Sequence, residues 1–296
     1  MSAVTAASRA RGRPGRIATG TIRAATLLVV AIVMLFPFYY LVWLSIAKDG
    51  SEFNFPPGFL PHPTHPGTIV SALAGRADQS GTVVHYFVNS LQYAGLATLG
   101  CLIMQCLVGY GFARFRFPGR NLLFSLTIAM MMMPFVVTLI PRFLFFAHLG
   151  LTDSLWPLII PWWFGGSPYG IFLMRQFFMS LPRELDEAAR VDGLNHWQIL
   201  WRILVPQAIP VLVSLGILEF VYFWNDLLGP LIYTQSDGSQ PISLGIFTQG
   251  TGSTFTISYP RFMAIALVMI APVALMFLGL QRQFRRGFLT SGLGGR

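Results

Sequence analysis

Charged residues are scarce in this chain of 296 residues. They make up 10% of it, whereas 54% of the residues are hydrophobic. Soluble domains usually carry about a quarter charged residues, so this deficit excludes an ordinary water-soluble globule and indicates a membrane protein. The 20 Lys and Arg against 11 Asp and Glu are dispersed among apolar segments, which indicates contact with membrane lipid and not with nucleic acid.

Lysine and cysteine are also rare, and each rarity excludes a kind of site. The only lysine, Lys48, precedes Asp49 and not the Ser or Thr of a P-loop, so the chain lacks a phosphate-binding loop of that form. Cys101 and Cys106 lie in one apolar run without CxxC or metal-ligand spacing. This spacing predicts two packed thiols and neither a disulfide nor a metal site.

Six apolar runs are long enough to cross about 30 Å of hydrocarbon. The sequence therefore predicts an all-α fold, a polytopic membrane bundle of six transmembrane helices. The first run is too long for a signal-peptide core and lacks a small-residue cleavage site, so we expect it to remain as an anchor. The predicted spans are Ala24–Ile46, Phe87–Phe112, Leu122–Ile140, Leu158–Phe178, Ile209–Ile232 and Phe262–Leu280.

The distribution of basic residues predicts the orientation of the chain. Only four of the 20 fall on one side of the membrane, namely Lys48, Arg76, Arg142 and Arg261. The other side carries the remaining 16 basic residues and both termini. Because the more basic side of a membrane protein is usually the cytoplasmic side, we expect both termini in the cytoplasm. We expect the Arg-rich N-terminal tail to be disordered near anionic headgroups. Proline density argues against regular structure in the first external loop.

The most informative stretch is the cytoplasmic loop Ser180–Pro210. Pro182 suits the first turn of a helix, and the acidic side chains of Glu184 and Asp186 complement the dipole of that turn. Gly193 is expected to end the helix in a left-handed conformation. The pattern predicts a short helix that lies outside the bilayer.

Side-chain spacing within this loop predicts further local contacts. Asp186 and Arg190 are spaced as an i,i+4 ion pair. Asn195 and Gln198 are spaced as a capping box that starts a second helix, which we expect to end at Pro206. One stripe of the first helix, with two alanines at its centre, would allow close approach to a partner protein; it comprises Leu185, Ala188, Ala189 and Asp192.

The same loop resembles a known family. Glu187-Ala188-Ala189, then Gly193, then Ile203 with Pro206 resembles the EAA motif of permease subunits in bacterial binding-protein-dependent ABC importers. Val205, where the pattern has Leu, is the one departure. Other segments are similar to the carbohydrate branch, the maltose-permease G-type subunits, over roughly residues 25–293. The segments similar to this branch are Phe55-Pro56-Pro57, Phe223–Asp226 and Arg286–Gly292, whereas Gly109–Arg114 and Leu173–Phe178 resemble the importer permease family in general.

The resemblance implies the type I ABC importer permease fold and a pore subunit that moves a carbohydrate by alternating access across the bacterial cytoplasmic membrane. It implies three partners: a second homologous permease, an ABC ATPase dimer and an extracytoplasmic solute-binding protein. The chain itself is then no enzyme and needs no cofactor, because ATP and magnesium are bound by the ATPase. Contacts with that ATPase are implied for Glu184, Glu187, Ala188, Ala189, Asp192, Gly193 and Pro206.

These expectations divide the chain into four regions. Residues 1–23 form a cytoplasmic tail, and residues 24–86 hold the first span and an extracytoplasmic loop. Residues 87–285 form the core permease domain with the EAA loop at 180–210. Residues 286–296 form a second cytoplasmic tail.

Polar residues within predicted spans are candidates for a substrate path, because they are costly in hydrocarbon. Glu219 lies near the middle of span five, and Asp226 follows seven residues later on the same predicted face. A polar stripe beside an aromatic ring suits a sugar; hydrogen bonds that hold helices together explain the two acids equally well. The neighbouring candidates are Trp224 and Asn225, and weaker ones are Asn89 and Tyr93.

Other interpretations remain open. The solute of such a permease is a sugar or another solute, such as a polyol phosphate or a polyamine; a polyamine path predicts more acids and a phosphate path more intramembrane Arg. A secondary transporter predicts coupling residues in several spans, whereas only span five has central carboxylates. A membrane enzyme is disfavoured, because no histidine is central to a span. Pro134 and Pro141 are candidates for a break in span three, although a kink explains them equally well, and Gly165-Gly166-Ser167 are candidates for a packing or bend role in span four.

Overall fold

A computed structural model describes residues 14–48, 64–74, 82–250 and 258–292. Within these residues the chain is helical and forms no β-sheet, which confirms the predicted all-α class. The helices are α1 (Pro14–Ser45), α2 (Gly67–Ala74), α3 (Val83–Arg114), α4 (Arg120–Met130), α5 (Phe135–His148), α6 (Trp156–Gly165), α7 (Pro168–Ser180), α8 (Glu184–Val191), α9 (His196–Ile199), α10 (Val205–Trp224), α11 (Leu228–Tyr233), α12 (Ile242–Gly250) and α13 (Tyr259–Gly292).

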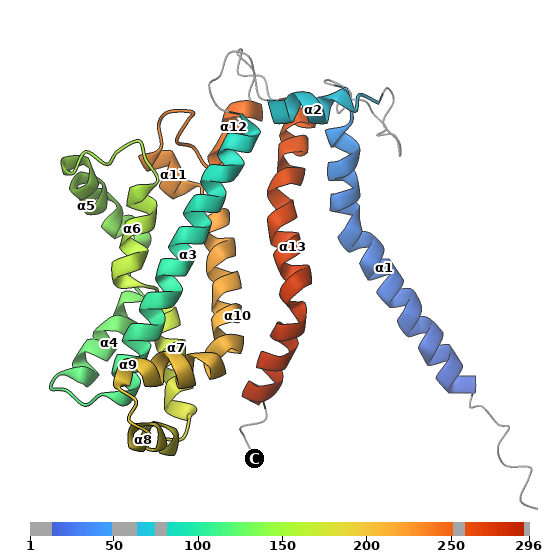
Figure 1. The fold of residues 1–296 in the computed structure, drawn as a ribbon. Helices are drawn as coiled ribbons and strands as arrows, with labels where there is room; N and C mark the ends of the chain where they lie inside the picture. Colours follow the sequence, from blue (N-terminus) through green and yellow to red (C-terminus); the bar gives the residue numbers. More distant parts are fainter. Residues whose placement is uncertain (1–13, 49–63, 75–81, 251–257, 293–296) are drawn as a thin grey trace, which may run out of the picture.

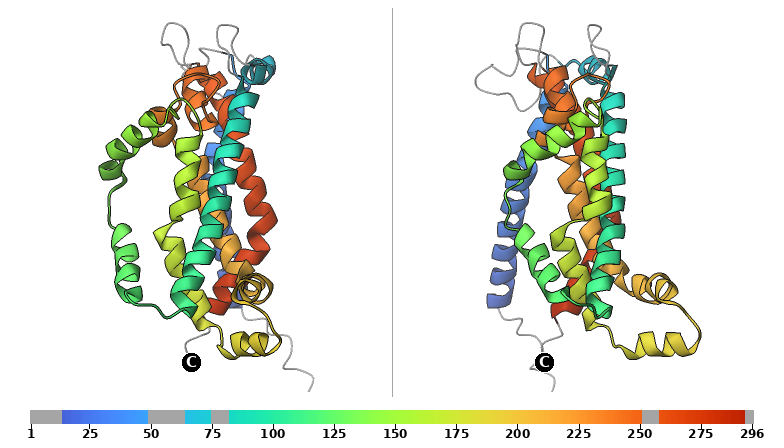
Figure 2. Two further views of the ribbon diagram at one scale, coloured as in Figure 1. Left: turned by 60° about the vertical axis from the view of Figure 1, so that its left-hand side comes forward. Right: turned by 90° about the vertical axis from the view of Figure 1, so that its left-hand side faces the viewer.

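Helix α3 lies at the centre of the bundle and contacts α6, α7 and α10. Gly109 allows α3 to approach α7 closely, because a Cβ atom at this position would lie 2.8 Å from the Cβ of Met174. Helices α4 and α5 form an outer arm beside α6 and α7 (Figure 2). Helix α1 contacts α13 and otherwise stands away from the bundle (Figure 1).

Among the residues that the structure describes, four helices are each long and apolar enough to cross a membrane. Helices α4 and α5, which are bent by 99° relative to each other, make a fifth candidate if the pair is one span. The predicted fourth span is divided between α6 and α7. The described residues are therefore compatible with six spans, and the number six stays a prediction. The four continuous candidates are Thr21–Ser45, Val83–Arg114, His196–Trp224 and Tyr259–Gly279.

The divided spans break at proline or glycine. Pro134 directly precedes α5 at the bend from α4, which confirms the predicted break there. Pro141 lies inside α5 and does not end it. Between α6 and α7, Gly166 has a φ of +60°, and Ser167 caps α7 with its side chain. The helix is therefore interrupted at this point.

Two predicted loop regions contain helices. Helix α1 begins at Pro14, within the tail that the sequence predicts to be disordered, and proline is favourable in a first helical turn. Helix α2 begins directly after Pro66, so the expectation of an irregular external loop is wrong there. Residues 1–13 and 293–296 of the predicted tails, and Phe55-Pro56-Pro57, lie outside the described residues.

The ends of the molecule differ in content. Helices α8 and α9, the first residues of α1 and the last residues of α13 lie at one end, whereas α2 and α12 lie at the other (Figure 1). The buried core has a cluster toward each end. The cluster near α8 joins that helix and α9 to α3, α7 and α10, so the EAA loop is packed onto the bundle.

Candidate functional site

Helix α8 has an inward face and an outward face. Asp186 and Ala189 are buried, and Ala189, which is 3% exposed, packs in the cluster that contains Met174 and Phe178. The prediction that Ala189 lies on an outward stripe with Ala188 is therefore wrong, because successive helical residues point about 100° apart. The outward face is exposed and consists of Glu184, Glu187, Ala188 and Val191.

An ion pair fixes the inward face of α8. Arg114 Nε lies 2.9 Å from Asp186 Oδ2, with side chains 4% and 10% exposed. The Arg114 guanidinium also donates a hydrogen bond to the Leu181 carbonyl oxygen, at 3.1 Å. The partner predicted for Asp186 was Arg190; the acid instead turns toward α3, because it lies on the buried side of the helix whereas Arg190 is exposed.

The turn after α8 follows the prediction closely. Gly193 has a φ of +83°. Its N–H bonds to the Arg190 carbonyl, and the Leu194 N–H bonds to the Ala189 carbonyl, the two hydrogen bonds of a Schellman motif. Asp192 is the C-cap residue. The turn therefore directs the chain from α8 into α9.

The predicted capping box is also present. The Asn195 side chain accepts the Gln198 N–H, and the Gln198 side chain accepts the Asn195 N–H, both at 2.9 Å. The second helix does not end at Pro206, however. Helical structure continues from α9 through a π-helical segment, Leu200–Leu204, into α10, and Pro206 lies in the first turn of α10. Proline is tolerated in a first turn, because its missing N–H is not needed there.

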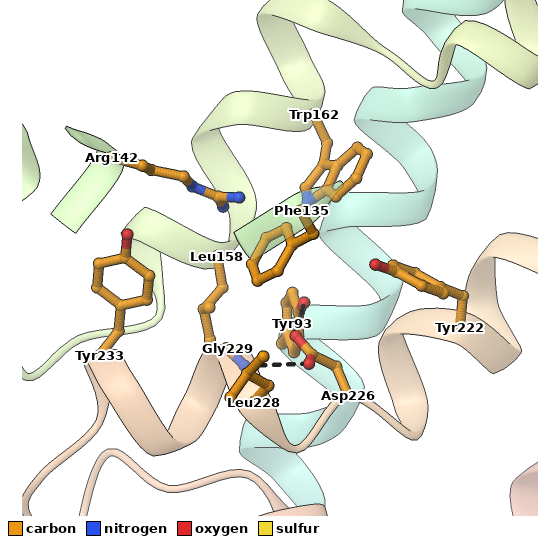
Figure 3. Close-up of a pocket in the computed structure, with 10 residues that line it drawn as sticks. All are labelled: Tyr93, Phe135, Arg142, Leu158, Trp162, Tyr222, Asp226, Leu228, Gly229 and Tyr233. Atoms are coloured by element: carbon orange, nitrogen blue, oxygen red, sulfur yellow. Dashed lines mark hydrogen bonds between the residues drawn. The ribbon is translucent and has the colours of Figure 1, made fainter. Parts of the chain in front are cut away.

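A polar cavity of about 150 Å³ lies toward the other end of the molecule (Figure 3). Its walls come from α3, α5, α6, α10 and α11, so the two divided spans and the end of span five meet there. Half of the ten lining residues are aromatic. The lining residues are Tyr93, Phe135, Arg142, Leu158, Trp162, Tyr222, Asp226, Leu228, Gly229 and Tyr233.

A larger cavity, of about 600 Å³, adjoins the first one. Phe135, Arg142 and Trp162 line both cavities. The larger cavity extends between α3, α4, α5 and α7, and its other lining residues are mainly apolar. Small-molecule sites usually have volumes of about 300–1,000 Å³. The larger cavity therefore has room for a solute, and the smaller one supplies polar groups at its boundary.

Asp226 lines the smaller cavity, but α10 ends at Trp224, before this residue. Asp226 Oδ2 accepts a hydrogen bond from the Tyr93 hydroxyl at 2.8 Å, and Oδ1 accepts the Gly229 N–H at 3.1 Å. The structure thus brings two predicted residues, Asp226 and Tyr93, together. The prediction that Asp226 shares a helical face with Glu219 is wrong, because the helix has ended.

Glu219 lies apart from both cavities, in contact with α3. Its Oε1 accepts hydrogen bonds from Gln105 Nε2 and from Cys101 Sγ, the latter at 3.4 Å. Gln105 is completely buried. This geometry matches the second interpretation of Glu219, a hydrogen bond that holds two spans together.

The remaining predicted residues do not line the described cavities. Trp224 is 1% exposed, stacks on Phe220 and donates its indole N–H to the Met269 carbonyl at 2.9 Å, so it is a packing residue. Asn225 is exposed and donates to the Val221 carbonyl. Asn89 donates to the carbonyl oxygens of Gly238 and Gln240 and so fixes the segment before α12.

Arg142 is a cavity residue that the sequence did not single out. Its guanidinium donates a hydrogen bond to the Pro157 carbonyl oxygen at 2.6 Å. That carbonyl would normally bond to the N–H four residues later, but this residue is Pro161, which has none. The spacing of two prolines four residues apart was the available signal. It marks a helix position that needs a donor from elsewhere.

Broken spans around a polar cavity, together with a short two-helix element packed at one end, define a membrane transport permease. The chain belongs to the family described as the binding-protein-dependent transport system inner membrane component, whose model matches residues 105–289.

Named relatives agree with this assignment. The chain is 32% identical over 267 residues to the sn-glycerol-3-phosphate transport system permease protein UgpE of Yersinia pestis bv. Antiqua (strain Antiqua). This match covers 90% of this chain and 94% of the relative. It is 33% identical over 210 residues to the arabinooligosaccharides transport system permease protein AraQ of Bacillus subtilis (strain 168). This second match covers 71% of this chain and 73% of the relative.

A solved structure shows the same fold. The similar chain belongs to a bacterial ABC transporter involved in the import of the acidic polysaccharide alginate, with a TM-score of 0.76 and 24% identity. The match covers 92% of this chain and 98% of that chain. It confirms the predicted ABC importer permease fold.

Proposed function

We propose that this permease imports a carbohydrate by alternating access, as one half of a pore that a separate ABC ATPase dimer drives. A second homologous permease supplies the other half of the pore, and an extracytoplasmic solute-binding protein delivers the solute. The ATPase binds ATP and magnesium. The outward face of α8, firmly attached to α3 through Arg114 and Asp186, is the single observation that carries this proposal.

The shape and charge of the outward face of α8 suit contact with another protein. Ala188 is small enough to permit close approach, and Val191, which is 88% exposed, adds an apolar contact. Glu184 and Glu187 flank them with negative charge. Since α8 is packed onto the bundle, a push on this face moves α3 and α7 with it.

The orientation belongs to the same proposal. The first residues of α1 and the last residues of α13 lie at the same end as α8 (Figure 1). If α8 faces the ATPase, both termini are cytoplasmic, in agreement with the basic residues, and the membrane is the bacterial cytoplasmic membrane.

A carbohydrate suits the lining of the cavities. Trp162 and Phe135 offer ring faces, and the hydroxyl of the exposed Tyr222 offers hydrogen bonds. The names of UgpE and AraQ state a polyol phosphate and oligosaccharides as their solutes, both rich in hydroxyl groups. A polyamine fits less well, because the one carboxylate of the smaller cavity, Asp226, already binds Tyr93 and Gly229.

Purification from native membranes tests the proposal. The tagged wild-type chain should co-purify with vanadate-sensitive ATP hydrolysis, and Ala188→Arg should remove that activity at an unchanged yield of folded permease. Ser180→Arg is the matched control, because Ser180 is exposed at the end of α7 and does not belong to the outward face of α8. Full ATP hydrolysis with Ala188→Arg, or an equal loss with Ser180→Arg, would contradict docking at this face.

A further inference from the structure

The Arg142 side chain lines both cavities and makes one hydrogen bond within the part of the chain that the structure describes. A guanidinium carries five N–H donors. One of its terminal nitrogens donates to the Pro157 carbonyl, whereas the buried Nε has no hydrogen-bond partner. Among the described residues no carboxylate lies within ion-pairing distance of Arg142. The charge is therefore held in place without being neutralised.

The other polar groups of the smaller cavity do not supply the missing partner. Both oxygens of Asp226 already accept hydrogen bonds, from Tyr93 and Gly229. The hydroxyl of Tyr233 is buried without a partner, and the Tyr233 ring lies 5.9 Å from the guanidinium carbon. Among the described residues, the Pro157 carbonyl is therefore the one hydrogen-bond acceptor of Arg142.

Arg142 also lies at the boundary between the two cavities, which it lines together with Phe135 and Trp162. Figure 3 shows its guanidinium pointing from α5 into the space that these residues surround. A solute in the larger cavity would therefore meet a fixed cation beside two aromatic rings. A partly buried cation without a counter-charge is costly, so an anionic group on the solute would stabilise the site.

We infer that the solute of this permease is an anionic carbohydrate or polyol, and that Arg142 binds its carboxylate or phosphate group. This inference rests on the proposed function and specifies its solute. The aromatic rings bind the apolar faces of the solute, while the guanidinium recognises the anion in a charge-assisted hydrogen bond. The hydrogen bond to Pro157 and the flanking Tyr233 ring hold the guanidinium ready for that contact.

Binding to the full chain in lipid nanodiscs tests the inference. The probes are two matched pairs: digalacturonate with its neutral methyl ester, and glycerol 3-phosphate with glycerol. Tryptophan fluorescence reports occupancy, because Trp162 lines both cavities, and Trp162→Phe should remove the signal. We expect the anionic member of at least one pair to bind at least about ten times more tightly, and the pair that shows this preference distinguishes a carboxylate from a phosphate.

Two variants distinguish a direct contact with Arg142 from a general effect of the positive charge of the protein. Arg142→Gln keeps an N–H for the Pro157 carbonyl but should abolish the preference for the anion. Arg175→Gln should keep it, because Arg175 lies over the Phe124 ring and lines neither cavity. Equal binding within both pairs by the wild type would overturn the inference and leave carbohydrate import standing. A preference that survives Arg142→Gln would overturn the role of Arg142.

Discussion

Arg114 and Asp186 form an ion pair, with 2.9 Å between Nε and Oδ2, that joins the end of α3 to the helix of the EAA motif. Gly109–Arg114 and the EAA loop are two of the segments that resemble the importer family, and this pair joins them physically. Because α3 also lines both cavities, through Tyr93 in one and Val108 in the other, the pair lies between the proposed docking face and the proposed solute path.

We predict that Asp186→Asn destabilises the chain by about 3–5 kcal/mol, because it leaves the Arg114 guanidinium buried without its counter-charge. The double variant Arg114→Met with Asp186→Leu removes both charges and should be more stable than either single variant. Thermal unfolding of the detergent-solubilised variants measures the difference. Single variants less than about 1 kcal/mol below the wild type would show that the pair does not hold α8.

The neighbouring alanines of the motif should respond differently to the same substitution. Ala189→Arg places a long charged side chain against Met174 and Phe178, so the yield of folded protein should fall sharply. Ala188→Arg points outward and should leave that yield unchanged. Size-exclusion chromatography of the two variants provides the measurement. Equal profiles would contradict the two-faced helix.

Gly193 should tolerate only residues that accept a left-handed backbone. At a φ of +83°, Gly193→Val should cost about 1–2 kcal/mol or more, and Gly193→Asn less, since Asn visits this region more readily. Thermal unfolding ranks the variants, and ATPase co-purification shows whether α8 is misplaced. If Val and Asn behave alike, backbone strain is not the cause.

Glu219 should contribute to assembly and not to solute affinity. Glu219→Leu leaves the buried Gln105 amide with only the Cys101 sulfur, a weak acceptor, and should cost about 1–2 kcal/mol, whereas Glu219→Gln keeps an acceptor oxygen and should cost less. The KM for solute uptake should stay at the wild-type value in Glu219→Gln. A changed KM would return this residue to the solute path.

The local features of the EAA loop were predictable from the sequence, because their causes are local. Gly193 and the Asn195–Gln198 pair act through the backbone within a few residues, and both lie as predicted. The direction of Ala189 was not predictable. Helical spacing shows which residues share a face, but α3 and α7 decide which face is buried.

The cavity was less predictable, for the same reason. Tyr93 and Asp226 were candidates because polar groups are rare in spans, and the structure brings them together. Arg142 was counted only as a basic residue near the external side. Its position depends on a bend at Pro134 and on a carbonyl left free by Pro161 in another helix. Such a contact between separate helices has no periodic signal.

Asp153 provides a test of the end opposite α8. It lies between α5 and α6 and has a φ of +60°. Its Oδ1 accepts the N–H groups of Gln235 and Ser236, at 2.9 and 2.8 Å, and the hydroxyl of Ser239. These bonds, that of the Ser236 N–H above all, lower the pKa of Asp153 to about 2. The carboxylate thus joins this loop to the segment after α11.

Because the folded pKa lies below the ordinary value, the stabilisation by Asp153 is fully present above about pH 4 and is lost as the pH falls toward 2. Asp153→Asn keeps a residue that tolerates positive φ while it removes the charge. The wild type should therefore melt at a higher temperature than Asp153→Asn at pH 6, and the difference should shrink between pH 4 and pH 2. A difference that stays constant over this range would show that ionisation of Asp153 does not stabilise the loop.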